Sequence, residues 1–143
     1  MATSIQVTFD CADPDTLADF WATALHYVKQ PPPEGYGTWE AFLSDHGMGN
    51  LIGTASAIVD PDRAGPRFFF QKVPEPKTAK NRMHLDLNVS QVRSVGMEEG
   101  KRRLAAEVDR LVGLGAVKVG TYEQHGETWI VMKDPEGNEF CVQ

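Results

Sequence analysis

One stretch near the middle of the chain, residues 83–89, constrains the fold more than any other. Its sequence is Met-His-Leu-Asp-Leu-Asn-Val, so apolar and polar residues alternate without a break. In a β-strand successive side chains point to opposite faces. One face therefore carries His84, Asp86 and Asn88, and the opposite face is apolar and suited to packing on helices. We expect this strand to form the floor of a ligand cavity in a curved sheet.

The overall composition limits the class of protein. The 143 residues suffice for one domain or two closely joined half-domains, and a hydrophobic content of 41% suffices for a core. The net charge of −6 argues against a nucleic-acid partner or an anionic membrane surface. No apolar run approaches the roughly 20 residues of a membrane span. We therefore expect a cytoplasmic protein without nucleic-acid or membrane partners.

The two cysteines do not predict a disulfide. Cys11 shares a strand face with Val7 and Phe9, whereas Cys141 alternates against Phe140 and Val142. These parities place Cys11 on the helix-packed side of its sheet and Cys141 on the cavity side. Free thiols are the rule in the cytoplasm.

The first half of the chain predicts a strand, a helix and further strands. Residues 4–11 alternate, and Asp13-Pro14 is typical of a helix start. The apolar spacing carries that helix to about Tyr27, where His26 is expected to end it in a left-handed conformation.

Beyond this helix we predict strands at 38–44 and 67–73. The first would carry Trp39 on one face, and the second contains three successive phenylalanines. Between them, residues 45–66 predict a long excursion with an apolar piece at 54–59. Loops of this length are often lids or binding loops.

The second half repeats this order. A helix is expected to end near Leu114, with Gly115 as the residue after its C-cap and an apolar stripe formed by Leu104, Val108, Leu111 and Val112. Three short strands follow at 117–122, 128–133 and 138–142, the last two joined by the turn sequence Asp-Pro-Glu-Gly.

A polar, proline-containing linker at 74–81 separates the two halves. We predict a single domain made of module one at 1–75 and module two at 81–143. The opening strands of the halves match at an offset of 78, which puts Gln6 opposite His84.

Four segments together resemble one known family: Asp-Cys-Ala-Asp-Pro at 10–14, Gly-Pro-Arg-Phe-Phe-Phe-Gln at 65–71, the segment 74–86, and Asp-Pro-Glu-Gly-Asn-Glu-Phe at 134–140. The chain resembles the glyoxalase-like and bleomycin-resistance-like branch of the vicinal oxygen chelate superfamily along its whole length, except around 45–65. This resemblance implies an α+β fold of two paired βαβββ modules. Their mostly antiparallel sheet would cup a cavity, and the protein would often form a homodimer.

Metal-dependent members of that superfamily place ligands on the first and last strand of each module. The matching positions here are Gln6, Gln71, His84 and Cys141. Of these, only His84 is a usual ligand of the metal-dependent enzymes, and carboxamides bind divalent ions weakly. We therefore predict no metal cofactor, the alternative being a divalent ion at His84.

The candidate site residues have two possible roles. His84 and Asp86 share a strand face and are candidate catalytic acids or bases, as is Glu139, although each could instead fill space or lie at a solvated rim. Gln6, Gln71 and Cys141 are candidate substrate contacts, and Cys141 could also be an inert buried thiol. The apolar cavity wall is expected to include Trp39, Phe69 and Trp129.

Two functions remain open on these residues. As an enzyme, the protein would be a glyoxalase-like lyase or isomerase that transfers a proton at a carbon next to a carbonyl. As a binding protein, it would sequester a small molecule such as an antibiotic and would need neither base nor metal.

Overall fold

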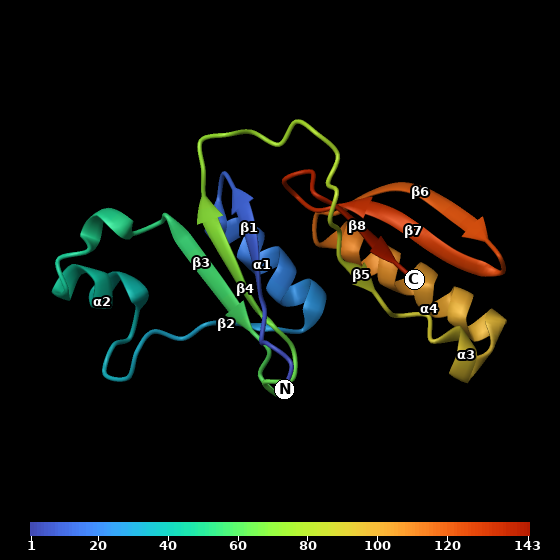
Figure 1. Ribbon diagram of the computed structural model, residues 1–143, viewed down its shortest axis with the longest axis horizontal. Helices are drawn as coiled ribbons and strands as arrows, with labels where there is room; N and C mark the ends of the chain where they lie inside the picture. The colour runs from blue at the N-terminus through green and yellow to red at the C-terminus, as the bar shows by residue number, and fades with distance from the viewer. The chain divides into compact units, whose positions relative to one another are not determined.

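The computed structural model describes residues 1–143, which divide into two compact units, Met1–Pro76 and Lys77–Gln143. The boundary falls inside the segment 74–81. Each unit combines one four-stranded sheet with helices (Figure 1). The fold class is α+β, as predicted. No helix is long and apolar enough to cross a membrane.

The first unit has a mixed sheet in the order β1-β4-β3-β2. Strand β1 runs parallel to β4, and β4 and β2 each pair antiparallel with β3. In chain order its elements are β1 (Gln6–Cys11), α1 (Pro14–Leu25), β2 (Val28–Lys29), α2 (Trp39–Asp45), η1 (Gly49–Leu51), β3 (Ala55–Val59) and β4 (Arg67–Lys72).

Helix α1 begins and ends as the sequence predicts. The carboxylate of Asp13 accepts hydrogen bonds from the backbone N–H of Thr16 at 3.2 Å and from its hydroxyl at 2.7 Å. His26 ends the helix with φ 58°, the left-handed conformation expected of it. The inner face of α1 packs on the sheet through Leu17, Phe20 and Trp21, all at most 5% exposed.

The strand predicted at 38–44 is wrong, because these residues form helix α2. Thr38 caps the helix, accepting a hydrogen bond from the backbone N–H of Ala41 at 3.1 Å. Helical spacing then brings Trp39 and Phe42 into edge-to-face contact, and it places His46 against Phe42 in a tilted arrangement with 4.2 Å between ring centroids. The capping threonine and the helical spacing of the aromatic residues favour a helix here, although the apolar residues also alternate as in a strand.

The excursion predicted at 45–66 supplies a central strand of the sheet. Its apolar piece is β3, which lies between β4 and β2 and buries Ile58 completely. At the end of the excursion, Gly65 lies directly against the ring of Tyr27, and a side chain at position 65 would collide with it.

The second unit repeats the sheet in the order β5-β8-β7-β6. Strand β5 runs parallel to β8, and β7 pairs antiparallel with both β8 and β6. In chain order its elements are β5 (Asp86–Leu87), α3 (Val92–Val95), α4 (Met97–Gly113), β6 (Val117–Gln124), β7 (Glu127–Lys133) and β8 (Glu139–Val142).

The predicted strand at 83–89 is shorter than expected. Only Asp86 and Leu87 belong to β5, although the backbone N–H of Cys141 also donates to the carbonyl of Leu85 at 2.9 Å. Met83 is 89% exposed and does not belong to an apolar face, because it precedes the part of the chain that pairs with β8. The other apolar residues of this stretch, on the face expected to pack on a helix, are only half-buried.

Helix α4 covers its sheet with Leu104, Val108 and Leu111, each at most 5% exposed. Val112 does not join this stripe and is 47% exposed, because it follows Leu111 by one residue and so points away from the sheet. The helix ends before Gly115, whose φ of 112° is left-handed as predicted.

Strands β6 and β7 form a tight hairpin. Its two turn residues, His125 and Gly126, both have positive φ, which matches the right-handed twist of the strands. The register of β6 shifts between Lys118 and Gly120, which marks a β-bulge in this edge strand.

Candidate functional site

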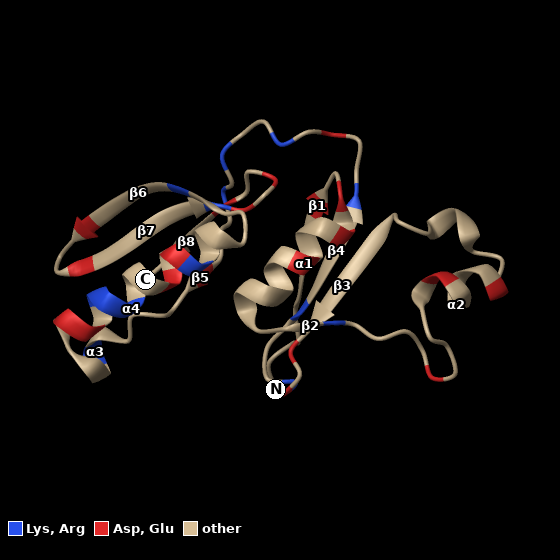
Figure 2. Cartoon of the chain, turned by 180° about the vertical axis from the view of Figure 1, so that it is seen from behind, with Lys and Arg blue, Asp and Glu red and all other residues tan.

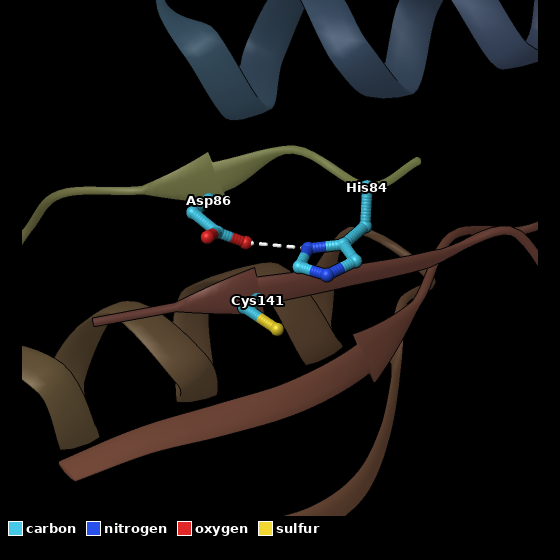
Figure 3. Close-up of side chains that lie close together, drawn as sticks. All are labelled: His84, Asp86 and Cys141. Atoms are coloured by element: carbon cyan, nitrogen blue, oxygen red, sulfur yellow. Dashed lines mark hydrogen bonds and ion pairs between the residues drawn. The ribbon is translucent and has the colours of Figure 1, made fainter. Parts of the chain in front are cut away.

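The parallel pairing of β5 with β8 builds a small polar cluster in the second unit. Asp86 and Cys141 are register partners, so their side chains lie on the same face of the sheet. His84 precedes Asp86 by two residues and reaches the same place. One donor atom from each of the three residues lies within 4.8 Å of the others (Figure 3). The sequence predicted this face, and the structure brings His84, Asp86 and Cys141 together on it.

His84 and Asp86 form a short hydrogen bond. The imidazole Nδ1 lies 2.7 Å from the Asp86 carboxylate. Because a carboxylate accepts hydrogen bonds, Nδ1 carries the proton, and the neutral ring then has its lone pair on Nε2. The two side chains are 40% and 39% exposed, so a ligand can reach them. The pair thus presents a basic nitrogen of fixed tautomer and orientation.

The Cys141 thiol is held in its protonated form. Burial is the main cause that raises its pKa, and the negative charge of Asp86 and a hydrogen bond to Asp86 raise it further. The ammonium of Lys80 acts in the opposite direction without cancelling these effects. Because the thiolate is the nucleophilic form, Cys141 is inert as a nucleophile at neutral pH.

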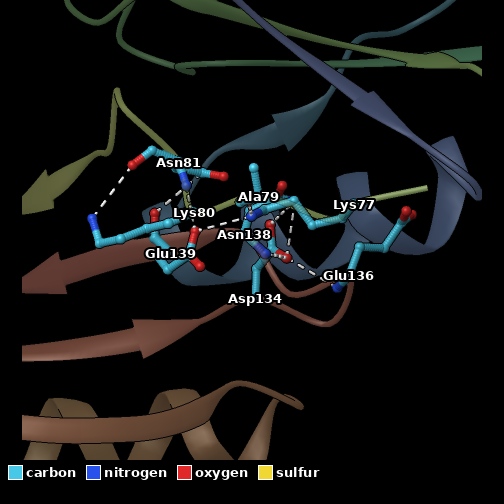
Figure 4. A network of polar contacts seen from close by, with 8 residues as sticks. All are labelled: Lys77, Ala79, Lys80, Asn81, Asp134, Glu136, Asn138 and Glu139. Atoms are coloured by element: carbon cyan, nitrogen blue, oxygen red, sulfur yellow. Dashed lines mark hydrogen bonds and ion pairs between the residues drawn. The ribbon is translucent and has the colours of Figure 1, made fainter. Parts of the chain in front are cut away.

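Glu139 lies in a different set of contacts, which ties the start of β8 to the linker. Its carboxylate accepts a hydrogen bond from the backbone N–H of Asn81 at 2.9 Å and lies 3.2 Å from the Lys77 ammonium (Figure 4). The Asn81 hydrogen bond is the main cause that lowers the pKa of Glu139 to about 2, and Lys77 contributes. A carboxylate with so low a pKa is a weak base, so these contacts favour a structural role.

The neighbouring turn is built around a buried carboxylate. Asp134 is 2% exposed and accepts hydrogen bonds from the backbone N–H groups of Glu136 and Asn138 at 2.9 and 3.0 Å. The Asn138 side-chain amide donates to both of its oxygens (Figure 4). The turn sequence at 134–138 therefore fixes the entry to β8 and has no open catalytic group.

In the first unit, Gln6 and Gln71 are engaged with neighbouring side chains. The Arg67 guanidinium donates to the Gln6 carbonyl oxygen at 2.6 Å, and the Gln71 amide donates to Asp10 at 2.6 Å. Gln6 and Gln71 do not contact each other, because they pair with opposite ends of the partner strands. Sequence reasoning missed Arg67, whose alternation with Phe69 and Gln71 along one strand face was the available signal.

The strand registers of the two units pair Gln71 and Cys141 with different positions of the opening strands. If Gln6 corresponds to His84, then Thr8 corresponds to Asp86 at the same offset of 78. The register partner of Thr8 is Phe69, and the partner of Asp86 is Cys141. Gln71 pairs instead with Asp10, so its equivalence to Cys141 stays a prediction.

The three predicted wall residues lie in different surroundings. Trp39 belongs to α2 and donates its indole N–H to the carbonyl of Gln30 at 2.9 Å. Phe69 is half-buried beneath the guanidinium of Arg67, which lies 5.1 Å from the ring centroid. Trp129 stacks on Tyr122 at 6.0 Å and lines a cavity of the second unit that none of the three cluster residues borders.

The donor set of the cluster suits one kind of metal. An imidazole nitrogen, a thiolate and a carboxylate oxygen would hold a borderline ion such as Zn²⁺, whereas Mg²⁺ and Mn²⁺ prefer oxygen donors. The separations of up to 4.8 Å are wider than the roughly 3.5 Å between ligands of a tetrahedral zinc ion. His84, Asp86 and Cys141 would have to close on the ion, and the thiol would have to ionise. The set fits zinc in kind but is not arranged for it.

A family model described as a glyoxalase-like domain matches residues 6–143. The chain belongs to this glyoxalase-like family, within the vicinal oxygen chelate superfamily. No curated protein sequence matches significantly.

Solved structures share the fold at low sequence identity. One is a glyoxalase/bleomycin resistance protein/dioxygenase family enzyme from Burkholderia phytofirmans, with a TM-score of 0.63 and 14% identity over 96% of this chain and 94% of that one. A second is the fosfomycin resistance protein FosX from Listeria monocytogenes, complexed with Mn(II) and a dihydroxypropylphosphonic acid. Its TM-score is 0.63 and its identity 11% over 100% and 90% of the two chains. A third, described as a possible glyoxalase from Bacillus cereus, has a TM-score of 0.59 and 12% identity over 100% and 99%.

Proposed function

We propose that the protein binds a small organic molecule against the face that carries His84, Asp86 and Cys141, and that it catalyses proton transfer there as a lyase or isomerase. The observation that carries this proposal is the 2.7 Å hydrogen bond between His84 and Asp86. It leaves one imidazole nitrogen, Nε2, as an oriented proton acceptor at an accessible face.

In this mechanism each cluster residue has a separate task. Asp86 holds the tautomer and direction of the imidazole, as an acid does beside a catalytic histidine. Nε2 of His84 takes a proton from a carbon next to a carbonyl and returns it at a neighbouring atom. The protonated Cys141 thiol lies within 4.8 Å of both groups and limits the space beside them without supplying a competing nucleophile.

We further propose that this chemistry proceeds without a divalent metal. Of the positions that the family resemblance assigns to ligands, Gln6 and Gln71 are carboxamides, and they are engaged with Arg67 and Asp10. The FosX structure contains Mn(II), a hard ion that prefers oxygen donors, whereas the cluster here offers only one carboxylate beside nitrogen and sulfur. If zinc were bound by the cluster residues, it would supply Lewis-acid polarisation of a carbonyl.

The alternative is a protein that sequesters its ligand without reaction. The state of the polar groups supports it, because Cys141 is protonated and Glu139 is committed to the linker. Among the predicted catalytic residues, the two carboxylates are already paired with other groups. His84 is then the only base left on this face.

Thermal-shift screening followed by substitution separates the two functions. The screen uses adducts of dicarbonyls with thiols, and aromatic antibiotics, with His84→Gln and Asp86→Asn as test variants and His46→Gln in the first unit as the matched control. An enzyme should turn over a stabilising adduct at a rate that His84→Gln lowers at least about a hundredfold. Stabilisation without turnover supports sequestration, and stabilisation that His84→Gln leaves unchanged removes His84 from the site.

Elemental analysis of protein purified without chelator tests the metal. We expect well under half an equivalent of any divalent ion, and a higher content that Cys141→Ser abolishes would show the cluster to be a metal site. The homodimer and the cytoplasmic location expected from the sequence remain predictions, which light scattering after size-exclusion chromatography and cell fractionation would check.

A further inference from the structure

The second unit contains a cavity that the proposed function does not use. Its volume is about 650 Å³, within the range of sites for drug-sized ligands. It lies where the chain around α3 and the first turns of α4 face the start of β7 and the C-terminal residue. Neither His84, Asp86 nor Cys141 lines it.

The cavity has an apolar wall made by three elements. Val92 of α3, Leu104 of α4 and Trp129 of β7 line it, and Leu104 is 4% exposed. A second hollow of about 360 Å³ runs on along α4 and shares Lys101, Leu104 and Thr128 with the first. The second hollow is also lined by Asp109, Lys118, Thr121 and Glu123, so the apolar surface for a ligand body lies in the first.

The charged groups at the cavity are predominantly positive. Arg93 and Lys101 line it together with a single acid, Glu127. Arg93 and Glu127 lie 3.7 Å apart with side chains 95% and 76% exposed, so they hold each other weakly. Lys101 makes no hydrogen bond or ion pair in the structure, although the glutamates of the same helix turn are close in sequence. An uncommitted ammonium therefore stands between the two hollows.

A pair of amides lines the cavity. The Gln143 amide donates to the Asn88 side-chain oxygen at 2.9 Å, which leaves the Asn88 N–H groups free to donate to a ligand. The lining thus offers hydrogen-bond donors and cations with only one carboxylate, in a chain whose net charge is −6.

We propose that this cavity is a second binding site, for an organic anion with an apolar body. The anionic group binds at the Lys101 ammonium, and the body lies against Val92 and Leu104. The carboxylate or sulfonate of such a ligand gains a cation that no protein carboxylate neutralises, and its body covers apolar surface that is otherwise wet.

Two fluorescent probes with the same ring system test the proposal. The probes are 8-anilinonaphthalene-1-sulfonate, which is an anion, and the uncharged N-phenyl-1-naphthylamine. We expect Lys101→Glu to weaken binding of the sulfonate about tenfold, because the reversal replaces an attraction by a repulsion over a few ångströms of partly hydrated surface. The uncharged probe should bind the variant as before.

Three further variants define the location. Lys133→Glu on β7 makes the same charge change outside the cavity and should leave both affinities unchanged. Thr128→Phe places a ring in the space shared by the two hollows and should weaken both probes. His84→Gln should weaken neither, so the result is independent of the proposed function.

Several results would overturn the proposal. These are a sulfonate affinity that Lys101→Glu leaves unchanged, a loss equally large in Lys133→Glu, and the absence of saturable binding of either probe. If circular dichroism shows that Thr128→Phe is unfolded, the comparison of the two lysine variants still tests whether the sulfonate binds at Lys101.

Discussion

The two units have the same architecture but different strand faces. Each sheet begins with a parallel pair, β1 with β4 or β5 with β8, and continues into antiparallel strands. With Thr8 matched to Asp86, the buried residues Phe68 and Phe70 of the first unit match Phe140 and Val142 of the second, and all four are at most 4% exposed. The core positions have therefore kept their apolar character in both units.

The faces opposite these cores have diverged. In the first unit the matched positions carry Gln6, Thr8 and Phe69, with Arg67 covering Gln6 and Phe69. In the second they carry His84, Asp86 and Cys141.

Charge differs between the units as well (Figure 2). Met1–Pro76 has 4 Lys and Arg against 10 Asp and Glu, whereas Lys77–Gln143 has 10 of each, so the first unit carries the whole net charge of −6. The two units thus combine apolar cores of the same kind with faces that carry different side chains.

The largest expected effect tests the equivalence of the cores. Phe140→Ala and Phe68→Ala each remove a buried ring, so we expect each to lower the free energy of unfolding by about 3–5 kcal/mol. Urea denaturation followed by circular dichroism measures this. A loss below about 1 kcal/mol at one of the two positions would show that the register match does not describe equivalent packing.

A smaller effect contrasts two carboxylates that organise turns. Asp134 in the second unit is 2% exposed. Asp134→Ala should therefore lower the free energy of unfolding by about 2–3 kcal/mol, because its N–H partners lose their acceptor. In the first unit Asp60 accepts from Asp62, Ala64 and Gly65, but water can replace it at the surface. Asp60→Ala should therefore lower the free energy of unfolding by less than Asp134→Ala does. A larger loss for Asp60→Ala in urea denaturation would refute the argument from burial.

The linker contacts of Glu139 predict a pH dependence that belongs to the second unit. Folding lowers its pKa from an ordinary value of 4.5 to about 2, mainly through the Asn81 hydrogen bond. Its stabilising contribution is therefore complete above pH 4.5 and is lost as the pH falls toward about 2. Glu139→Gln should flatten this part of the stability profile, measured as the urea midpoint against pH. An unchanged difference between the two proteins from pH 5 to 3 would contradict the prediction.

The smallest expected effect concerns the thiol. Burial and Asp86 raise the pKa of Cys141, so iodoacetamide should modify it more slowly than a free cysteine at pH 8. Asp86→Asn removes one of the two causes and should speed the reaction severalfold in the Cys11→Ser background, while His46→Gln should not. Mass spectrometry of quenched samples gives the rates, and equal rates in Asp86→Asn and its parent would show that Asp86 does not act on the thiol.

Local sequence signals predicted those parts of the fold that local interactions determine. The alternation of β1 and the capping pattern of α1 depend on neighbouring residues, and the structure confirms both. The prediction at 38–44 was wrong because a short apolar stretch fits either period, and the cap at Thr38 decided between them. The role of β3 could not be predicted from the apolar piece at 54–59, because a central place in a sheet depends on distant partners.

The candidate site was predictable to a similar extent. Parity along one strand placed His84 and Asp86 together, but the position of Cys141 beside them depends on the register of β5 with β8. The linker partners of Glu139 could not be predicted, since 58 residues separate Asn81 from it and no periodicity connects the two.

The β-bulge between Lys118 and Gly120 bears on how this protein behaves at high concentration. Strand β6 is an edge of its sheet, eight residues long, and Val117, Val119 and Tyr122 on it are 48–58% exposed. A flat edge of this kind is a template on which further chains add and aggregate. The bulge interrupts the regular ladder and increases the local twist, and Lys118 adds a charge beside it. Deleting the extra residue would straighten the strand and convert a protected edge into one that promotes aggregation.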